Sequence, residues 1–301
     1  MLHRHINPQG FTLAAIDDVI SRGQWADWAE LRSAVLIDRS LLAKVEKVCI
    51  AHAADPYAQR YHFWMNYAEN SSAASLQRIL PDAVLVGGTA SALHAGHRFS
   101  RDADHVLTDL RDRFDEVLAE LESVAGWKTA RVQRPVQILG SLDGIETGVR
   151  QLIRDEPLET MAVSHKSGTI VIPTEAEILR IKSVLILKRN ATRDYLDFVA
   201  LADHMGEVDA ARALYSFDRL YQQPNGESPL QQLQIQLANA LPYDLDEFKL
   251  SEYKCLAERW HDWNAVKTVC ADMATVIFDR VCDRSGGSLE RTSGSDPGRH
   301  R

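Results

Sequence analysis

The chain has 301 residues, of which 45% are hydrophobic and 25% are charged. These proportions are ordinary for a globular protein and exclude a disordered or fibrous chain. The formal net charge of −8 argues against a surface that coats nucleic acid indiscriminately, although a cleft can still hold a local basic patch. We therefore expect a compact folded core with helical additions.

The cysteines and the apolar runs indicate the compartment. The four cysteines form no CxxC pair and have no zinc-ligand spacing. The N-terminus lacks the apolar run of a signal peptide, and no apolar stretch reaches the roughly 20 residues that a membrane helix needs. We expect a cytoplasmic protein without a membrane partner.

Residues 1–80 are expected to form an N-terminal helical region. Thr12 can cap a helix that Gly23 ends, and apolar residues then recur at helical spacing until Pro56 interrupts the pattern. A group of aromatic residues follows. We interpret them as packing this region onto the next one, because platforms that stack nucleic-acid bases are usually interleaved with Arg and Lys. They are Tyr57, Tyr61, Phe63, Trp64 and Tyr67.

Residues 81–173 are expected to form an α/β core. A short apolar run at 83–86 predicts a buried strand that ends in a tight turn at two glycines. Helical and strand patterns then alternate along the chain. Helices are predicted at 89–97 and 109–124, and further strands at 104–107, 127–132, 136–139, 145–152 and 169–172.

The remainder of the chain is expected to be helical, with a disordered end. Thr174 and Glu177 have the spacing of a capping box at the start of a helix. Helical patterns continue, so we predict a C-terminal helical domain over 174–284. Residues 285–301 are rich in Gly, Ser and charge, and predict a disordered tail.

The chemistry is concentrated in residues 85–107. Gly87 and Gly88 follow a strand, and Thr89 begins the predicted helix. Glycines let the backbone approach a phosphate, and the amides of a helix N-terminus attract anions. Asp102 and Asp104 are two residues apart on a strand, so they point to the same face and can bind a hard cation such as Mg²⁺.

In this order and spacing, the motif resembles the signature of the nucleotidyltransferase superfamily: an apolar run, Gly-Gly or Gly-Ser, and then Asp-x-Asp on a strand. More narrowly, it resembles the AbiEii/AbiGii toxin family of type IV toxin–antitoxin systems. The resemblance implies a small mixed sheet flanked by the N-terminal helical region and a C-terminal helical bundle. It also implies that the glycine turn and the run before the aspartates bind the nucleotide. The matching residues are Gly87, Gly88, Thr89, Ala90, Gly96, Arg98, Ser100, Asp102 and Asp104.

A second block, residues 175–201, resembles the helical motif of the same family. Lys182 and Arg189 are seven residues apart, so they share a helix face and can reach a triphosphate or an RNA backbone. Arg193, Asp194 and Asp197 complete the pattern. By resemblance, Lys182 and Arg189 bind the nucleotide, and Lys182 and Asp194 belong to the catalytic surroundings. An ordinary charged helix face is the alternative interpretation.

The superfamily usually adds a third metal-binding carboxylate from a later strand. Glu146 is our choice, because it and Arg150 alternate with apolar residues that would face the core. Asp143, on the preceding turn, is the alternative.

These residues predict a Mg²⁺-dependent transfer of a nucleoside monophosphate from an NTP to an acceptor, with two metal ions and release of pyrophosphate. The resemblance implies an RNA acceptor, such as a tRNA 3′ end, or a protein hydroxyl. It further implies a toxin paired with a separately encoded antitoxin protein. A catalytically idle nucleotide- or partner-binding module on the same fold is the main alternative. A small-molecule nucleotidyltransferase of the aminoglycoside type ranks third, because the 182–193 stretch is basic where such a pocket would be acidic.

Overall fold

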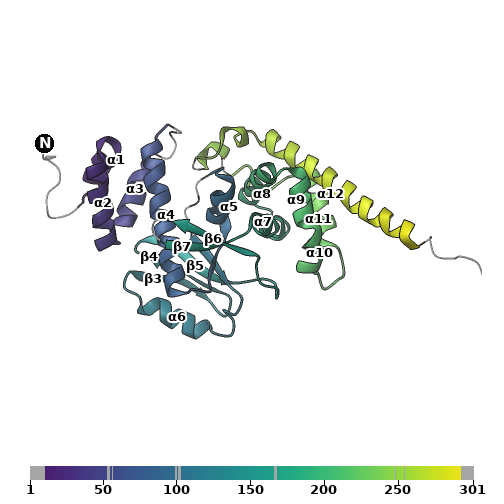
Figure 1. Ribbon diagram of the computed structural model, residues 1–301, viewed down its shortest axis with the longest axis horizontal. Helices are drawn as coiled ribbons and strands as arrows, with labels where there is room; N and C mark the ends of the chain where they lie inside the picture. Colours follow the sequence, from purple (N-terminus) through teal and green to yellow (C-terminus); the bar gives the residue numbers. More distant parts are fainter. Residues whose placement is uncertain are drawn as a thin grey trace, which may run out of the picture. The chain divides into compact units, whose positions relative to one another are not determined.

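The computed structural model describes residues 11–52, 55, 57–98, 100, 103–165, 168–247, 249–253 and 255–292. The chain forms two compact units (Figure 1). The first contains Met1–Ile178 with Ser251–Ala257, and the second contains Leu179–Leu250 with Glu258–Arg301. Within the described part of the chain, no helix has the length and apolar character that a membrane crossing requires.

The first unit begins with four helices, in the part of the chain where the sequence predicts a helical region. Thr12 Oγ1 accepts a hydrogen bond from the Ala15 amide at 3.2 Å, and Gly23 follows the last residue of the first helix, so the predicted cap and end are confirmed. The buried faces of the four helices share one apolar cluster that includes Ile16, Leu31, Val45 and Trp64. The helices are α1 (Leu13–Arg22), α2 (Trp25–Ile37), α3 (Leu41–Ala51) and α4 (Gln59–Ile79).

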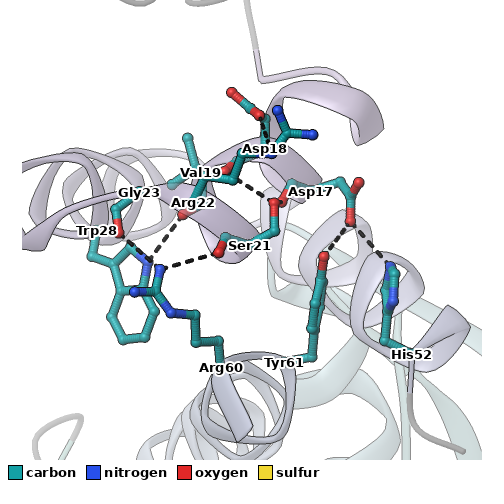
Figure 2. Close-up of polar contacts among 10 residues, drawn as sticks. All are labelled: Asp17, Asp18, Val19, Ser21, Arg22, Gly23, Trp28, His52, Arg60 and Tyr61. Atoms are coloured by element: carbon teal, nitrogen blue, oxygen red, sulfur yellow. Dashed lines mark hydrogen bonds and ion pairs between the residues drawn. The ribbon is translucent and has the colours of Figure 1, made fainter. Parts of the chain in front are cut away.

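A polar network ties α1 to α3 and α4 (Figure 2). The Tyr61 hydroxyl donates to the Asp17 carboxylate at 2.7 Å, and His52 Nε2 lies 3.1 Å from the same oxygen. The rings of His52 and Tyr61 stack with centroids 3.8 Å apart. Burial, and then the hydrogen bond to Asp17, raise the pKa of Tyr61 to about 12. The phenol is therefore protonated at neutral pH and acts as the donor.

Arg60 connects α4 to the end of α1, also shown in Figure 2. Its guanidinium donates to the carbonyl oxygens of Ser21 at 3.2 Å and Gly23 at 3.0 Å. It also lies over the Trp28 ring, 5.6 Å from the centroid, while the Trp28 indole donates to the Val19 carbonyl at 3.0 Å. A cation near the last carbonyls of a helix is favourable, so these contacts stabilise the α1–α2 corner.

The predicted packing role of the aromatic residues is only partly correct. Tyr61, Trp64 and Tyr67 are buried in the helical cluster. Phe63 stacks on a neighbouring indole but is 48% exposed, and Tyr57 is 87% exposed. Tyr57 therefore does not pack the helical region onto the rest of the first unit.

A five-stranded mixed sheet follows the helices and confirms the predicted α/β class. Its strand order is β1-β2-β5-β4-β3, with β2 and β5 parallel and the other neighbours antiparallel. Helix α6 (Phe114–Ser123) packs its apolar residues against one face of the sheet. The strands are β1 (Val84–Leu85), β2 (Ala103–Leu107), β3 (Trp127–Gln133), β4 (Gln137–Leu142) and β5 (Ile145–Gln151).

A separate two-stranded sheet contains one strand that the sequence analysis missed. β6 (Thr160–His165) pairs antiparallel with β7 (Gly168–Pro173). Met161, Ala162 and Ser164 on β6 are all exposed. The strand therefore lacks the apolar–polar alternation by which a half-buried strand is recognised.

The helix that follows β7 begins differently from the predicted capping box. Thr174 Oγ1 accepts from the Glu177 amide at 3.3 Å, which is half of the expected pair. The Thr174 amide, however, donates to the Glu159 carbonyl at 2.8 Å. The buried Glu177 carboxylate forms an ion pair with Arg154 at 2.9 Å. The Glu177 carboxylate thus pairs with the buried Arg154 of the first unit, and the Thr174 amide has the Glu159 carbonyl as its acceptor.

The second unit is helical. Its core includes the fully buried side chains of Phe198, Leu201, Leu214 and Leu233. The last helix extends through Thr292, into the segment for which the sequence predicted disorder, and residues 293–301 lie outside the described ranges. The helices are α7 (Glu175–Arg189, of which the first turn belongs to the first unit), α8 (Thr192–Met205), α9 (Glu207–Ala213), α10 (Phe217–Leu220), α11 (Pro229–Ala238) and α12 (Trp263–Thr292).

Candidate functional site

The glycine motif forms the N-terminus of helix α5 (Gly87–Ala95). The helix begins at Gly87, two residues before the predicted start, and replaces the predicted tight turn. Gly87 has φ +75°, a backbone conformation that strongly favours glycine. Val86 is the N-cap, and its own side chain provides no capping hydrogen bond. The first-turn amides of Gly87, Gly88 and Thr89 lack intrahelical acceptors by geometry, which makes such a terminus suited to an anion.

Gly88 lets two other motif residues approach the backbone. A Cβ atom at this position would lie 2.5 Å from Ser100 Oγ and 2.5 Å from Arg98 Nη2. No side chain larger than hydrogen fits unless these groups move. The structure therefore places Arg98 and the buried Ser100 against the start of α5, as the motif spacing suggests.

Asp104 lies beside the same turn. A Cβ atom at Gly87 would be 3.5 Å from the Asp104 Cβ, and the Val86 amide donates to the Asp104 carbonyl at 2.8 Å. The Asp104 side chain is 30% exposed, so its carboxylate can accept a ligand from solvent. Asp102, the first predicted metal ligand, lies outside the described residues.

Arg150 is a site residue that the sequence analysis did not assign. Its Nε lies 3.7 Å from Asp104 Oδ1. Across β4 and β5 it is the register partner of Gln137, whose amide oxygen, in the orientation that suits both side chains, accepts from the guanidinium at 2.5 and 3.1 Å. The arginine is thus held between Gln137 and Asp104. The only sequence signal was its expected position on the same strand face as Glu146.

The strand register places Glu146 on the Asp104 face of the sheet. Asp104 is the register partner of Gly148 on the parallel strand β5, and Glu146 is two residues before Gly148. Because partners in register share a face and alternate residues along a strand also do, Glu146 and Asp104 project to the same side. The exposed Glu146 alternates with buried Ile145 and Thr147, as the sequence predicts.

Asp143, the alternative third carboxylate, has a different structural role. Asp143 and Gly144 both have positive φ, 54° and 86°, and form the two-residue turn between β4 and β5. Asp-Gly is a favoured pair for this type of hairpin turn. The Asp143 carboxylate lies 3.8 Å from Arg39 Nε, and burial raises its pKa above the usual range, although the arginine opposes the shift.

His105, next to Asp104, belongs to the interior. It is fully buried, and burial lowers its pKa to about 4. Its Nδ1 lies 2.9 Å from the Ala103 carbonyl, to which only an N–H can donate. The imidazole is therefore neutral at ordinary pH and takes no part in the face that carries Asp104.

The donor set on this face suits a hard cation. Magnesium prefers oxygen ligands such as carboxylates, and Asp104 and Glu146 both offer them. Within the described ranges, which omit Asp102, no group of three or more His, Cys, Asp and Glu side chains is placed to hold a metal ion.

The structure brings together the predicted residues of the second block within the second unit. Lys182 Nζ lies 2.6 Å from Asp197 Oδ2 and 3.6 Å from Asp194 Oδ1. Arg189 donates to both Asp194 oxygens, at 2.5 and 2.8 Å. The side chains of Lys182 and both aspartates are buried, whereas that of Arg189 is 38% exposed. The basic residues predicted to bind phosphate thus converge on buried carboxylates.

Comparison with known proteins gives partial likenesses. No known family's sequence model matches the chain. Over 237 residues it is 30% identical to the "Heme uptake protein MmpL11" of Mycobacterium tuberculosis H37Rv and to the "Probable transport protein MmpL11" of Mycobacterium bovis, covering 70% of this chain and 22% of theirs. It is 34% identical over 131 residues to the "Mycolic acid-containing lipids exporter MmpL11" of Mycolicibacterium smegmatis, covering 42% of this chain and 13% of that one. The chain therefore spans only about a fifth of the length of the two MmpL11 proteins named first, and a smaller part of the third. The activities in their names belong to those whole proteins.

Similarity to a solved structure is also found. This is the crystal structure of a candidate nucleotidyltransferase from H. pylori, with a TM-score of 0.41 and 18% identity, covering 70% of this chain and 95% of that one. A TM-score this low does not establish a shared fold.

Proposed function

We propose that this chain is a nucleotidyltransferase that transfers a nucleoside monophosphate from an NTP to an acceptor hydroxyl and releases pyrophosphate. The observation that carries the proposal is the position of Asp104 beside Gly87, at the glycine-initiated N-terminus of α5. An anion-binding helix end next to a partly exposed carboxylate is the pairing that a metal-bound triphosphate requires.

The triphosphate is proposed to bind at the start of α5. The amides of Gly87, Gly88 and Thr89 would donate to its oxygens, because a helix N-terminus carries the positive end of the helix dipole. Arg98 and Ser100, which contact the position of Gly88, add a cation and a hydroxyl at the same place.

Magnesium is proposed to bind at Asp104, Asp102 and Glu146. Glu146 is preferred over Asp143 because it shares a strand face with Asp104, whereas Asp143 forms a turn. When bound, magnesium would neutralise phosphate charge and activate the attacking hydroxyl. Arg150 is proposed to orient the Asp104 carboxylate through the contact at 3.7 Å.

Other parts of the proposal rest on the sequence resemblance alone. These are the nucleotide-binding and catalytic roles of Lys182, Arg189 and Asp194, the RNA or protein acceptor, and the action as a toxin with a cognate antitoxin. The geometry of the second unit adds that Arg189 is the more exposed of the two cations. It is therefore the one better placed to meet a phosphate from solvent.

The test is incubation of the purified chain with each α-radiolabelled NTP, magnesium and total bacterial RNA. Asp104→Asn and Asp102→Ala remove the proposed metal ligands, and Glu116→Gln, an exposed carboxylate on α6, is the matched control. We expect label on RNA or on protein with the wild type and the control, and none with the two aspartate variants.

Each outcome of this experiment has a definite meaning. Label on a tRNA-sized band identifies an RNA acceptor, and label on the protein identifies a hydroxyl side chain. Labelling that persists in Asp104→Asn contradicts the proposed metal site. If NTP binds but no label is transferred under any condition, the catalytically idle module replaces the enzyme.

A further inference from the structure

Cys255 has an unusual backbone and lies in the segment Ser251–Ala257, which belongs to the first unit. None of the four cysteines, all of which lie in the described part of the chain, forms a disulfide: Cys49 and Cys270 are buried, Cys282 is exposed, and Cys255 is half-buried. Cys255 also has φ +51°, a left-handed conformation that costs energy for any residue except glycine. Strained backbone of this kind is enriched at functional sites, although in this chain Asp143 shows that a turn can also require it.

The thiol is hydrogen-bonded to a histidine from a distant part of the chain. Cys255 Sγ lies 3.1 Å from Nδ1 of His62 on α4. The other ring nitrogen, Nε2, lies 2.9 Å from the backbone carbonyl oxygen of Asp55.

The second contact determines which nitrogen of His62 carries the proton. A carbonyl oxygen can only accept, so Nε2 of His62 must be the donor. In the neutral ring, Nδ1 then has a lone pair, and this lone pair faces the sulfur of Cys255. The arrangement is that of a nucleophile beside a base whose far side is oriented by a third group. The thiolate is the reactive form of cysteine, and a neighbouring imidazole promotes it.

We propose that Cys255 is a nucleophilic thiol, activated by His62, that forms a mixed disulfide with a low-molecular-weight disulfide. His62 Nδ1 takes the thiol proton, and Cys255 Sγ attacks one sulfur of the disulfide. The new S–S bond forms as the original one breaks, and the departing thiolate takes the proton from Nδ1. The Cys255 sulfur is oxidised and the departing sulfur is reduced, so no other oxidant is needed.

A metal site fits this pair less well than a covalent adduct. Structural metal sites with sulfur and nitrogen ligands need about four ligands. Within the described part of the chain no group of three or more His, Cys, Asp and Glu side chains is gathered in this way. The two groups, the Cys255 thiol and the His62 imidazole, are instead sufficient for thiol–disulfide exchange.

The proposed modification site is close in the chain to a contact with the segment that follows α5. The Ala257 amide, two residues after Cys255, donates to the His97 carbonyl at 2.8 Å. His97 directly precedes Arg98, which packs against Gly88. An adduct on Cys255 is expected to weaken the Ala257–His97 bond and so loosen the backbone that carries Arg98.

The test uses the full chain and hydroxyethyl disulfide, followed by intact-protein mass spectrometry. Cys282→Ser leaves Cys255 to be measured, and Cys255→Ser leaves the exposed Cys282 as the reference. At about pH 6.5, two units below the ordinary cysteine pKa, we expect Cys255 to react about tenfold faster than Cys282 or more. Equal rates would overturn the proposal, since Cys282 is the more exposed thiol.

A second measurement separates activation by His62 from simple exposure. In His62→Gln, the Cys255 rate should fall about tenfold, to that of Cys282, with the melting temperature checked in parallel.

If this variant does not fold, the pH profile of the Cys282→Ser protein decides the question. Below its pKa, an unactivated thiol reacts about tenfold faster for each unit by which the pH increases. The rate of Cys255 should rise clearly less steeply with pH. A full tenfold rise per unit would overturn the proposal. Faster hydrogen exchange of the Ala257 amide in the adduct would support the link to the segment that follows α5, and unchanged exchange would remove it. None of these readouts depends on nucleotidyl transfer.

Discussion

Asp104 in the first unit and Asp194 in the second are both predicted site carboxylates, but the protein treats them differently. The Asp104 side chain is 30% exposed, and the Nε of Arg150 is 3.7 Å away. Asp194 is fully buried and accepts hydrogen bonds from Arg189 Nε at 2.5 Å and Arg189 Nη2 at 2.8 Å. Its Oδ1 also lies 3.6 Å from Lys182 Nζ. A buried charge is costly unless it is paired, whereas an exposed one can exchange its partners. Asp104 is therefore suited to bind a ligand, and Asp194 to hold a structure together.

The largest effect should come from unpairing the buried cluster. Lys182→Met leaves Asp194 and Asp197 buried without the shared ammonium, so we expect the free energy of unfolding to fall by about 3–5 kcal/mol. Urea denaturation would measure this. The control is Lys188→Met, an exposed lysine on the same helix, which should change stability by less than about 0.5 kcal/mol. A loss below about 1 kcal/mol for Lys182→Met would show that the cluster does not require its lysine.

The opposite pattern is expected for Asp104→Asn. Its partly exposed contact with Arg150 should contribute less than about 1 kcal/mol to stability. Loss of a metal ligand should nevertheless lower nucleotidyl transfer by about a hundredfold or more, which corresponds to about 3 kcal/mol of activation free energy. Parallel transfer assays and thermal melts would measure the two effects. A large drop in melting temperature would mean that Asp104 is as structural as Asp194.

Gly88→Ala should affect both stability and binding. The new Cβ would meet Ser100 Oγ and Arg98 Nη2 at 2.5 Å, so we expect about 1–3 kcal/mol of destabilisation from overpacking and weaker NTP binding. Gly96→Ala is the matched control, because its Cβ would meet nothing within 4 Å although its φ is +60°. That variant should lose stability through backbone strain and keep its NTP affinity. Equal NTP affinities in the two variants would exclude Gly88 from the nucleotide site.

The smallest effect concerns Tyr61, whose partner Asp17 has a half-exposed carboxylate. The pKa of Tyr61 is raised to about 12 in the folded chain, above the ordinary value of about 10. The protonated Tyr61 therefore contributes to the free energy of unfolding, and this contribution is fully present below about pH 10 and is lost as the pH rises through about 12. An ultraviolet titration of the wild type minus Tyr61→Phe should show this tyrosine ionising near pH 12. A midpoint near pH 10 would show that Asp17 does not hold the phenol.

Much of the fold was predictable because its signals are local. The cap at Thr12 depends on contacts within one turn, and the apolar alternation of β5 reports which residues face the core. The failures have local reasons too. β6 is largely exposed and has no alternation, and Gly87 enters α5 directly because a glycine in the left-handed region can begin the helix.

The candidate site was predictable only in part. The spacing of the glycines and aspartates indicated that these motifs would meet, and the structure brings Ser100 to Gly88 and Asp104 to Gly87. Arg150 was not assigned, because its contact with Asp104 depends on the parallel pairing of β2 and β5. The Cys255–His62 contact joins residues 193 positions apart, and no spacing rule covers such a pair.

The sequence by itself determined the α/β class, the helical N-terminus and the order of strand, glycines, helix and aspartates. These follow from periodicity and from residue types whose effects extend over a few positions. Only the tertiary structure decided which carboxylates are buried and paired, which face of the sheet Glu146 shares with Asp104, and which cysteine meets a histidine. The physical reason is that burial, strand register and ion pairing depend on chain segments far apart in sequence, whose approach is set by the packing of the whole unit.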